Sequence, residues 1–396
     1  MSKILPSIAV MHPSSAKSAK PKKRVSFDEL LLAGVRAISE KGIDQVNVTD
    51  VTSIAKVSRP TFYTYFGDMN GFFAEIWVHH GREWLNDQYN PGDKEPTQEL
   101  LWIDTAILQI FAASRRIPEV AEVVQPEFER WWLALVGDDH RKGINVSWYM
   151  GAVLGAKISR PVSGAKIEAG LSFVPKLEIS PLEFKAPHMI GLGKPPKELP
   201  EMAGIVLDSE KIDDMLTQSA IDVIAKSGVA AASMVRIARR ARVSTGAVYP
   251  RYKSIEALIE ASFGKAIGDI VTGNVAMIDK HGPGIDQYGI AVNAGFGKSR
   301  EVWRHYRTEM HLAAMYNPRL AIVMAPGFDE TAGILEANTA RLGVPAELAR
   351  QLAWFMHIHA IGIAMIYDVY PEIAKLDNRY MARHFSAVLL KGVIFR

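Results

Sequence analysis

The sequence predicts an all-α protein made of two tandem helical units. Apolar residues recur at helical spacing over most of the chain, a segment that follows residue 42 recurs after residue 228, and prolines gather between the two halves. A length of 396 residues fits two to three domains. Hydrophobic residues make up 48% of the chain and charged residues 22%, which is ordinary for a globular protein with packed cores.

The composition excludes several classes of protein. There are no cysteines, so disulfides, thiolate metal sites and cysteine catalysis are excluded, which fits a reducing cytoplasm. The net charge of +3 is too weak to indicate nucleic-acid binding by itself. Residues 352–369 come closest to the roughly 18 apolar residues of a membrane span, but they contain two histidines and Asp368 and predict a buried helix. We expect a cytoplasmic protein with no membrane segment and no signal peptide.

The N-terminal segment, residues 1–24, predicts a disordered basic arm. It is rich in Ser, Ala, Lys and Pro and ends in a basic string from Lys20 to Arg24. It is either an arm that meets phosphates or a minor groove, or a solvated tail. Helical periodicity begins at Ser26, which fits a capping box with Glu29, and Gly42 is placed to end that helix.

An internal repeat is the most informative feature of the sequence. Residues 42–73 align without gaps to residues 228–259 at a constant offset of 186. Identities are few, but residue class holds throughout, with these matches: Gly42 and Gly228, Val48 and Met234, Val51 and Ile237, Ala55 and Ala241, Val57-Ser58 and Val243-Ser244, Phe62 and Val248, Tyr63 and Tyr249, Phe66 and Tyr252, Phe72 and Leu258. The chain therefore contains two copies of one unit.

Each copy predicts two short helices joined by a tight turn. In residues 47–66, Asn47 is an N-cap, the turn lies at Lys56, and Ser58 caps the second helix. In residues 233–252, the capping residues are Ser233 and Ser244. This helix-turn-helix arrangement buries a small apolar face and presents its second helix to a major groove of DNA.

The candidate DNA contacts are small, polar or cationic residues, because these reach base edges and phosphates. The first copy offers Asn47, Thr49, Ser58, Arg59, Thr61, Tyr63, Thr64 and Tyr65. The second copy offers Ser233, Arg236, Arg239, Ser244, Thr245, Gly246, Tyr249, Arg251 and Lys253, with Arg240 and Arg242 also on the preceding helix and turn.

Both copies resemble the DNA-binding domain of the tetracycline-repressor (TetR) family. The matching strings are AKVSRPTFYTYF and ARVSTGAVYPRY, within about 60 residues per copy. The resemblance implies a helical effector domain after each DNA-binding domain, dimeric use of two recognition helices, and repression relieved by a small molecule.

The two copies also depart from the family pattern. The turn glycine is replaced by Lys56 and Arg242, each at a cost of about 1 kcal/mol if the backbone is left-handed there. A phosphate-contacting lysine of the family is replaced by Met69 and Ile255. Pro250 is placed to end the second recognition helix early, so one copy could have lost tight DNA contact.

These motifs divide the chain into six segments. After the arm, we expect a DNA-binding domain at 25–90, a truncated helical effector domain at 95–160, a connector at 161–207, a second DNA-binding domain at 208–272, and a helical effector and dimerisation domain at 283–396. The stretch from Pro161 to Pro200 has seven prolines, which excludes long helices and favours an extended connector. Alternation at Leu171, Phe173, Leu177 and Ile179 hints at a short β-hairpin within it.

Two unlike recognition helices in one chain predict an asymmetric operator. The chain forms either an internal pseudo-dimer or a homodimer with four DNA-binding heads. Equivalent heads should lie about 34–36 Å apart, or a multiple of that.

The second effector domain is expected to bind a small, apolar effector. Its candidate ligand-binding residues are Trp303, Tyr306, Met310, Trp354, His357 and Met365, and core packing is the competing interpretation for each. Glu301, His305 and Glu309 share a helical face, but a hydrogen-bonded face is favoured over a metal site. We expect no metal, no cofactor and no catalytic residue.

The best interpretation is a DNA-binding transcriptional repressor and not an enzyme. Nucleotide-binding, nucleophile and zinc-protease motifs are missing from the sequence. One alternative is a ligand- or partner-binding helical protein whose helix-turn-helix units have decayed, because the turn glycines and phosphate lysines are replaced. A second alternative, an enzyme on a helical scaffold, is supported by the Glu301–Glu309 stripe alone.

Overall fold

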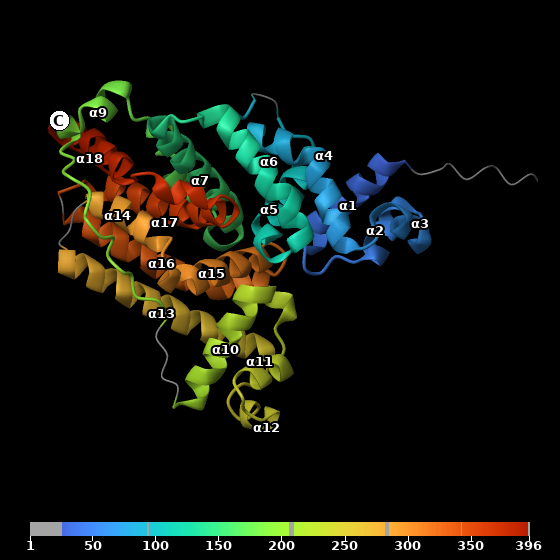
Figure 1. Ribbon diagram of the computed structural model, residues 1–396. Coiled ribbons are helices and arrows are strands. Elements are labelled where there is room, and N and C mark those ends of the chain that lie inside the picture. The colour runs from blue at the N-terminus through green and yellow to red at the C-terminus, as the bar shows by residue number, and fades with distance from the viewer. Residues whose placement is uncertain (1–25, 93–94, 206–209, 282–284, 342, 395–396) are drawn as a thin grey trace, which may run out of the picture.

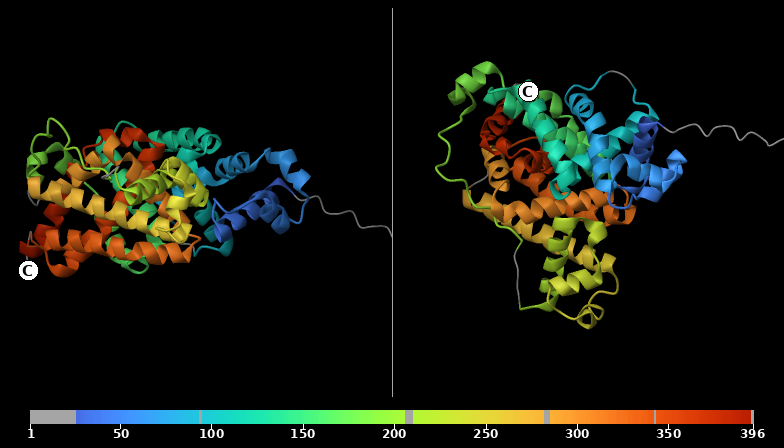
Figure 2. Two further views of the ribbon diagram at one scale, coloured as in Figure 1. Left: turned by 90° about the horizontal axis from the view of Figure 1, so that it is seen from below. Right: turned by 45° about the vertical axis from the view of Figure 1, so that its right-hand side comes forward.

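The chain folds into helices throughout the part that the structure describes. The computed structural model describes residues 26–92, 95–205, 210–281, 285–341 and 343–394, and no strand occurs among them. The basic arm at 1–24 lies outside the described residues. Figures 1 and 2 show α1–α3 projecting from one end of a helical body and α10–α12 projecting from a neighbouring side.

The first half begins with a three-helix head and continues into the body. Its elements are α1 (Phe27–Lys41), α2 (Val48–Ala55), α3 (Arg59–Phe66), α4 (Met69–Tyr89), α5 (Gln98–Ala113), η1 (Ser114–Arg116), α6 (Pro118–Val136) and α7 (His140–Ser163). We call α1–α3 the first head. The predicted capping box forms, because the Ser26 hydroxyl accepts from Glu29 N and the Glu29 carboxylate accepts from Ser26 N. Helix α1 ends at Gly42, which has a φ of 86°.

The second half repeats this plan and adds helices. Its elements are α10 (Ile212–Ser227), η4 (Val229–Ala231), α11 (Met234–Arg240), α12 (Thr245–Val248), α13 (Ile255–His281), α14 (Ile285–Gly295), η5 (Lys298–Arg300), α15 (Glu301–Ala314), α16 (Pro318–Ala340), α17 (Ala346–Val369), η6 (Pro371–Lys375) and α18 (Arg379–Ile394). We call α10–α12 the second head. Helices α1 and α10 pack on α5 and α15, respectively, so each head rests on an equivalent body helix.

The connector holds short helices and not the expected hairpin. Its elements are α8 (Lys166–Leu171), η2 (Val174–Lys176), α9 (Pro181–Lys185) and η3 (Pro187–Ile190). Prolines occupy the first turn of the last three, where no backbone N–H is needed. Phe173, Leu177 and Ile179 are buried from this irregular backbone, so the apolar alternation reflects burial and not strand pairing.

Three internal prolines do not break their helices. Pro126 lies inside α6, Pro161 inside α7 and Pro326 inside α16. All three are exposed. The carbonyl that each proline leaves without a donor can therefore bind water, which lowers the cost of continuing the helix.

Helices α7 and α17 cross closely at glycines, and the crossing is nearly symmetric. A Cβ on Gly155 would lie 1.8 Å from the carbonyl oxygen of Ile358, and a Cβ on Gly362 would lie 1.9 Å from the carbonyl oxygen of Gly151. Gly151 and Gly155 precede Ile358 and Gly362 by the same number of residues. Each half therefore uses an equivalent pair of positions to contact the other half, as in an isologous interface.

Helix α17 is the buried helix that the sequence predicts over 352–369. It is long and apolar enough to cross a membrane, but 83% of its most apolar window is buried inside the protein. It packs against α7, α8, α16 and α15. Its hydrophobicity is accounted for by this central position.

The turn of each helix-turn-helix unit contains a left-handed residue that is not glycine. Lys56 has φ 56° and Arg242 has φ 58°, and these two are the non-glycine residues with positive φ in the described chain. They are matched positions of the repeat. Both copies therefore keep the turn backbone that usually requires glycine and bear its steric cost.

Replacing Gly155 with Ala should separate α7 from α17. We expect the free energy of unfolding to fall by about 1–3 kcal/mol, because the methyl group overlaps the backbone of α17. Gly264→Ala is the control, since Gly264 is an exposed residue of α13 with no heavy atom within 4 Å of an added Cβ. Urea unfolding of the full chain measures both. Equal effects in the two variants would contradict the close crossing.

Glycine at either turn should stabilise the protein. Lys56→Gly and Arg242→Gly should each raise the free energy of unfolding by about 1 kcal/mol, because glycine adopts positive φ without the Cβ clash. Lys56→Ala and Arg242→Ala are the controls, because they remove the charge and keep the Cβ. If alanine stabilises as much as glycine, charge and not backbone strain is the cause.

Candidate nucleic-acid interface and cavity

The first head is held together by aromatic packing behind its second helix. Phe62 and Phe66 on α3 contact the ring of Phe72 on α4, with ring centroids 5.0 and 4.6 Å apart. Asn47 caps α2 by accepting from Thr49 N and Asp50 N. The core fixes the inner face of α3, so its other face is left for contacts outside the chain.

The first-head candidates lie at the surface, on α2, on α3 and at the residues that precede these helices. Asn47, Thr49, Ser58, Arg59, Tyr63, Thr64 and Tyr65 are exposed, and Thr61 is half-buried. The predicted cap at Ser58 is wrong in one respect: Ser58 precedes α3, but its hydroxyl makes no capping hydrogen bond and instead meets the Thr61 hydroxyl at 2.9 Å. The Thr64 hydroxyl donates to Pro60 O, so its hydrogen is already used.

The second head has a shorter second helix. Helix α12 spans Thr245–Val248, half the length of α3, and the chain turns at Tyr249 and Pro250. This agrees with the early ending expected from Pro250, which cannot donate to a helical carbonyl. The small core beneath it joins Leu216, Ile237, Val248 and Leu258.

The second-head candidates are also at the surface. Ser233, Arg239, Ser244, Thr245, Gly246, Tyr249, Arg251 and Lys253 are exposed, and Arg236 is half-buried. Ser233 caps α11 by accepting from Arg236 N, whereas the Ser244 hydroxyl makes no capping bond. Arg251 pairs with Asp213 at 3.0 Å and Arg240 with Asp222 at 2.8 Å. Arg239 and Arg242 form no ion pair within the described residues.

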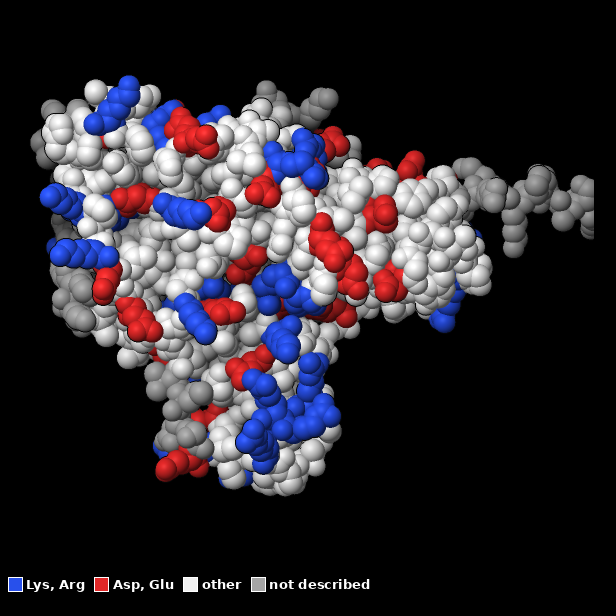
Figure 3. All heavy atoms as spheres, in the orientation of Figure 1, with Lys and Arg blue, Asp and Glu red and all other residues white. Residues whose placement is uncertain are grey.

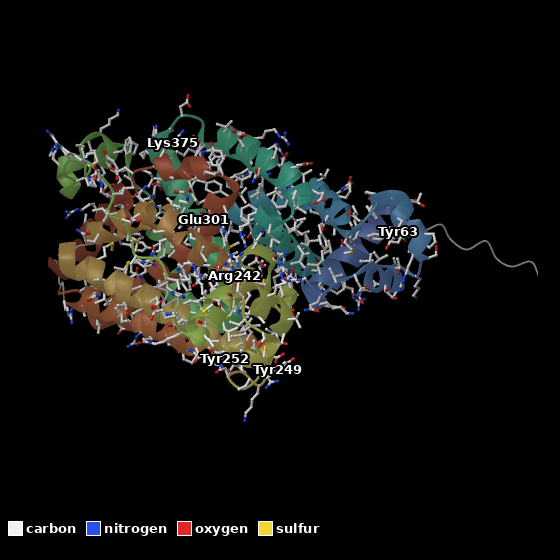
Figure 4. The ribbon with its side chains drawn as sticks, turned by 60° about the horizontal axis from the view of Figure 1, so that its bottom comes forward. Tyr63, Arg242, Tyr249, Tyr252, Glu301 and Lys375 are labelled. Carbon is white, nitrogen blue, oxygen red and sulfur yellow. The ribbon has the colours of Figure 1, made fainter. Side chains whose placement is uncertain are left out.

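The two heads differ in charge. Residues 216–262 contain seven Lys and Arg against three Asp and Glu, whereas residues 30–76 contain four against five. Figure 3 shows the resulting cluster of basic side chains over the second head and a largely uncharged or acidic first head on the same face. Figure 4 shows Tyr63 on the first head and Tyr249 on the second, at separate places on the molecule.

A buried ion-pair cluster joins the two halves where the heads meet the body. Glu309 on α15 accepts from Arg116 Nε at 2.9 Å and also pairs with Arg115, and both arginines belong to η1 of the first half. Arg116 also pairs with Asp44 of the first head. Burial lowers the pKa of Arg116, but the carboxylates of Glu309 and Asp44 outweigh burial and hold that pKa above its ordinary value.

The same cluster reaches both heads. The Tyr316 hydroxyl donates to Asp44 at 3.2 Å, and its ring fills the space beside Gly42. Arg116 in turn lies beside Gly228 at the end of α10. The base of each head is therefore in contact with a side chain from the opposite half.

Glu301, His305 and Glu309, which share one face of α15, do not meet at a common site. Glu309 belongs to the buried cluster, His305 lies 3.3 Å from Asp368, and Glu301 is exposed. Within the described residues, no three His, Asp or Glu side chains are grouped to hold a metal ion.

The second half contains a cavity of about 230 Å³ between α13, α14, α15, α16 and α17. Of the six predicted ligand residues, Trp303 and His357 line it. The structure places the other four in the packed core: Tyr306, Met310, Trp354 and Met365. Tyr306 is held there by a 2.9 Å hydrogen bond to Ser262.

Sequence reasoning missed the most polar part of the cavity. Arg300, Arg304 and Arg307 line it from η5 and α15. Their spacing of four and three residues places them on one helical face, a signal that the sequence contains.

Comparison with known proteins agrees with this geometry. The sequence model described as "Bacterial regulatory proteins, tetR family" matches residues 30–76 and residues 216–262, which cover most of the two heads. A curated relative, "Uncharacterized HTH-type transcriptional regulator YvdT" of Bacillus subtilis (strain 168), is 24% identical over 148 residues, a match that covers 31% of this chain and 73% of that protein. The chain carries two TetR-type DNA-binding units in tandem, and these findings support a transcription regulator of the TetR type.

Proposed function

We propose that this DNA-binding regulator is a repressor in which both heads of one chain contact an asymmetric operator. The observation that carries the proposal is the near-symmetric crossing of α7 and α17, which pairs the two halves within one chain as two subunits would pair. The heads differ in sequence, helix length and charge, so each recognises its own half-site. Cytoplasmic location follows from this role.

The second head supplies most of the phosphate affinity in this proposal. Its exposed arginines would contact the DNA phosphates. The first head, in contrast, has more carboxylates than cations between residues 30 and 76. The first head instead presents an eight-residue α3 with exposed hydroxyls, which suits contacts with base edges.

A small molecule with an apolar body would release the operator. The cavity is lined by α15, the same helix that holds Glu309 in the cluster under both heads. A ligand that shifts α15 therefore acts on the base of each head at once, provided that it binds the two arrangements with different affinity. Trp303 and His357 are the predicted residues that we retain as ligand contacts, because they line the cavity.

The competing proposal is a ligand- or partner-binding protein with decayed heads. The strained turns at Lys56 and Arg242 and the four-residue α12 favour it. The basic surface of the second head argues against it, because unpaired arginines on a head serve no purpose unless that head binds an anion such as DNA.

Salt-dependent binding to duplex DNA separates the two proposals. Arg239→Ala should weaken binding to any duplex and reduce the slope of log K against log salt by about 0.9, because one phosphate contact is lost. Arg59→Ala should weaken binding mainly to duplexes with the first half-site. Lys375→Ala is the control, since Lys375 is exposed and lies far from both heads (Figure 4).

Fluorescence anisotropy over a range of salt concentrations makes this measurement. A shallow slope for the unaltered chain, with no effect of either head variant, would establish the decayed-head proposal instead.

A further inference from the structure

Three arginines line the cavity of the second half, two of them buried and the third half-buried. Arg300 is 3% exposed and Arg304 6% exposed, and Arg307 lines the same wall. All three project from η5 and α15. Burying a guanidinium away from water costs several kcal/mol unless an anion compensates it. These guanidinium groups therefore lower the stability of the protein when no anion is bound in the cavity.

The partners of these guanidinium groups are mostly neutral. Arg300 donates to Asn274 Oδ1, Arg304 to the carbonyls of Gly295 and Gly297, and Arg307 to the carbonyl of Ala360. The Nε atoms of all three have no hydrogen-bond partner in the described chain. Each arginine thus keeps donor capacity beside the cavity.

Protein carboxylates neutralise this wall only in part. Among the described residues that line the cavity, none is Asp or Glu. Asp368 forms an ion pair with Arg304, 3.9 Å from its Nε, and is shared with Arg115 at 4.0 Å and His305 at 3.3 Å. Burial lowers the pKa of Arg300 to about 10, and burial together with the neighbouring Arg300 and Arg304 lowers the pKa of Arg307 to about 10.

The remaining cavity wall is mostly apolar, with a few neutral polar side chains such as Gln287, Thr331 and Asn338. It is formed by Ile267, Phe328, Leu335, Leu352 and Met356, among others. His357 adds little positive charge, because burial lowers its pKa to about 3. The cavity therefore combines one cationic wall with an apolar interior.

We propose that this cavity binds an amphiphilic anion, with the acidic head on Arg300, Arg304 and Arg307 and the apolar body between α13, α16 and α17. The inference rests on the proposed ligand response and names its chemical class. Arginine suits this role because its fixed donors bind a carboxylate or phosphate through paired, charge-assisted hydrogen bonds. A neutral compound of the same shape would leave the three donors buried without an anion.

Isothermal titration of the full chain with decanoate and with decan-1-ol tests the proposal. Both probes contain the same nonyl chain, and they differ in the head, which is a carboxylate in one and a hydroxymethyl group in the other. Decanoate should bind at least about tenfold more tightly, the value of roughly one charge-assisted hydrogen bond. Equal binding, tighter binding of the alcohol, or no binding of decanoate would overturn the proposal.

Two arginine variants locate the effect. Arg307→Met and Arg300→Met should each reduce decanoate affinity about tenfold or more while leaving decan-1-ol affinity unchanged. Both should also raise the melting temperature of the empty protein, because a buried charge is removed. Arg350→Met is the control, since the Arg350 side chain is 55% exposed. If each arginine variant lowers the melting temperature and weakens both probes alike, the arginines are structural and the proposal fails.

Operator binding with and without decanoate keeps the two proposals distinguishable. Decanoate that binds and releases DNA supports both. Decanoate that binds without changing DNA affinity supports the anion site and contradicts ligand-relieved repression. If decan-1-ol matches decanoate in affinity and both release DNA, the anion site is contradicted and ligand-relieved repression stands.

Discussion

A buried carboxylate determines how the two halves of this protein fit together. Glu309 is fully buried, and an unpaired carboxylate in such a place would destabilise the fold strongly. Its partners, Arg115 and Arg116, come from the other half of the chain. Because Arg116 also holds Asp44 at the base of the first head, the position of that head depends on the same ion pairs that join the halves.

The two halves are similar in plan but have diverged at this point. On α5, Gln109 occupies the place of Glu309 relative to the matched prolines Pro118 and Pro318, and it bonds the end of α1 in its own half. Glu309 instead reaches across to the first half. One chain can specialise its two copies in this way, whereas a homodimer of identical subunits must use one sequence for both. The unequal charge of the two heads is a second difference that two copies in one chain can acquire independently.

The local features were predictable from the sequence, and the long-range ones were not. The caps at Asn47 and Ser233, the stop at Gly42 and the left-handed turn at Lys56 depend on neighbours within a few residues. The helices that run through Pro161 and Pro326 depend on which helix face is exposed, which packing decides. The cavity arginines could not be recognised as cavity residues from the sequence alone. Whether a side chain lines a cavity or lies in a packed core depends on contacts between helices far apart in the chain.

Both heads of a single chain should engage one operator. Selection of binding sites from random duplex DNA, followed by the mass of the chain in the selected complex, tests it most directly. We expect an enriched site with two unlike half-sites, about one DNA turn or a multiple apart, occupied by one chain. A palindrome occupied by two chains would contradict it, because only one kind of head would then contact DNA.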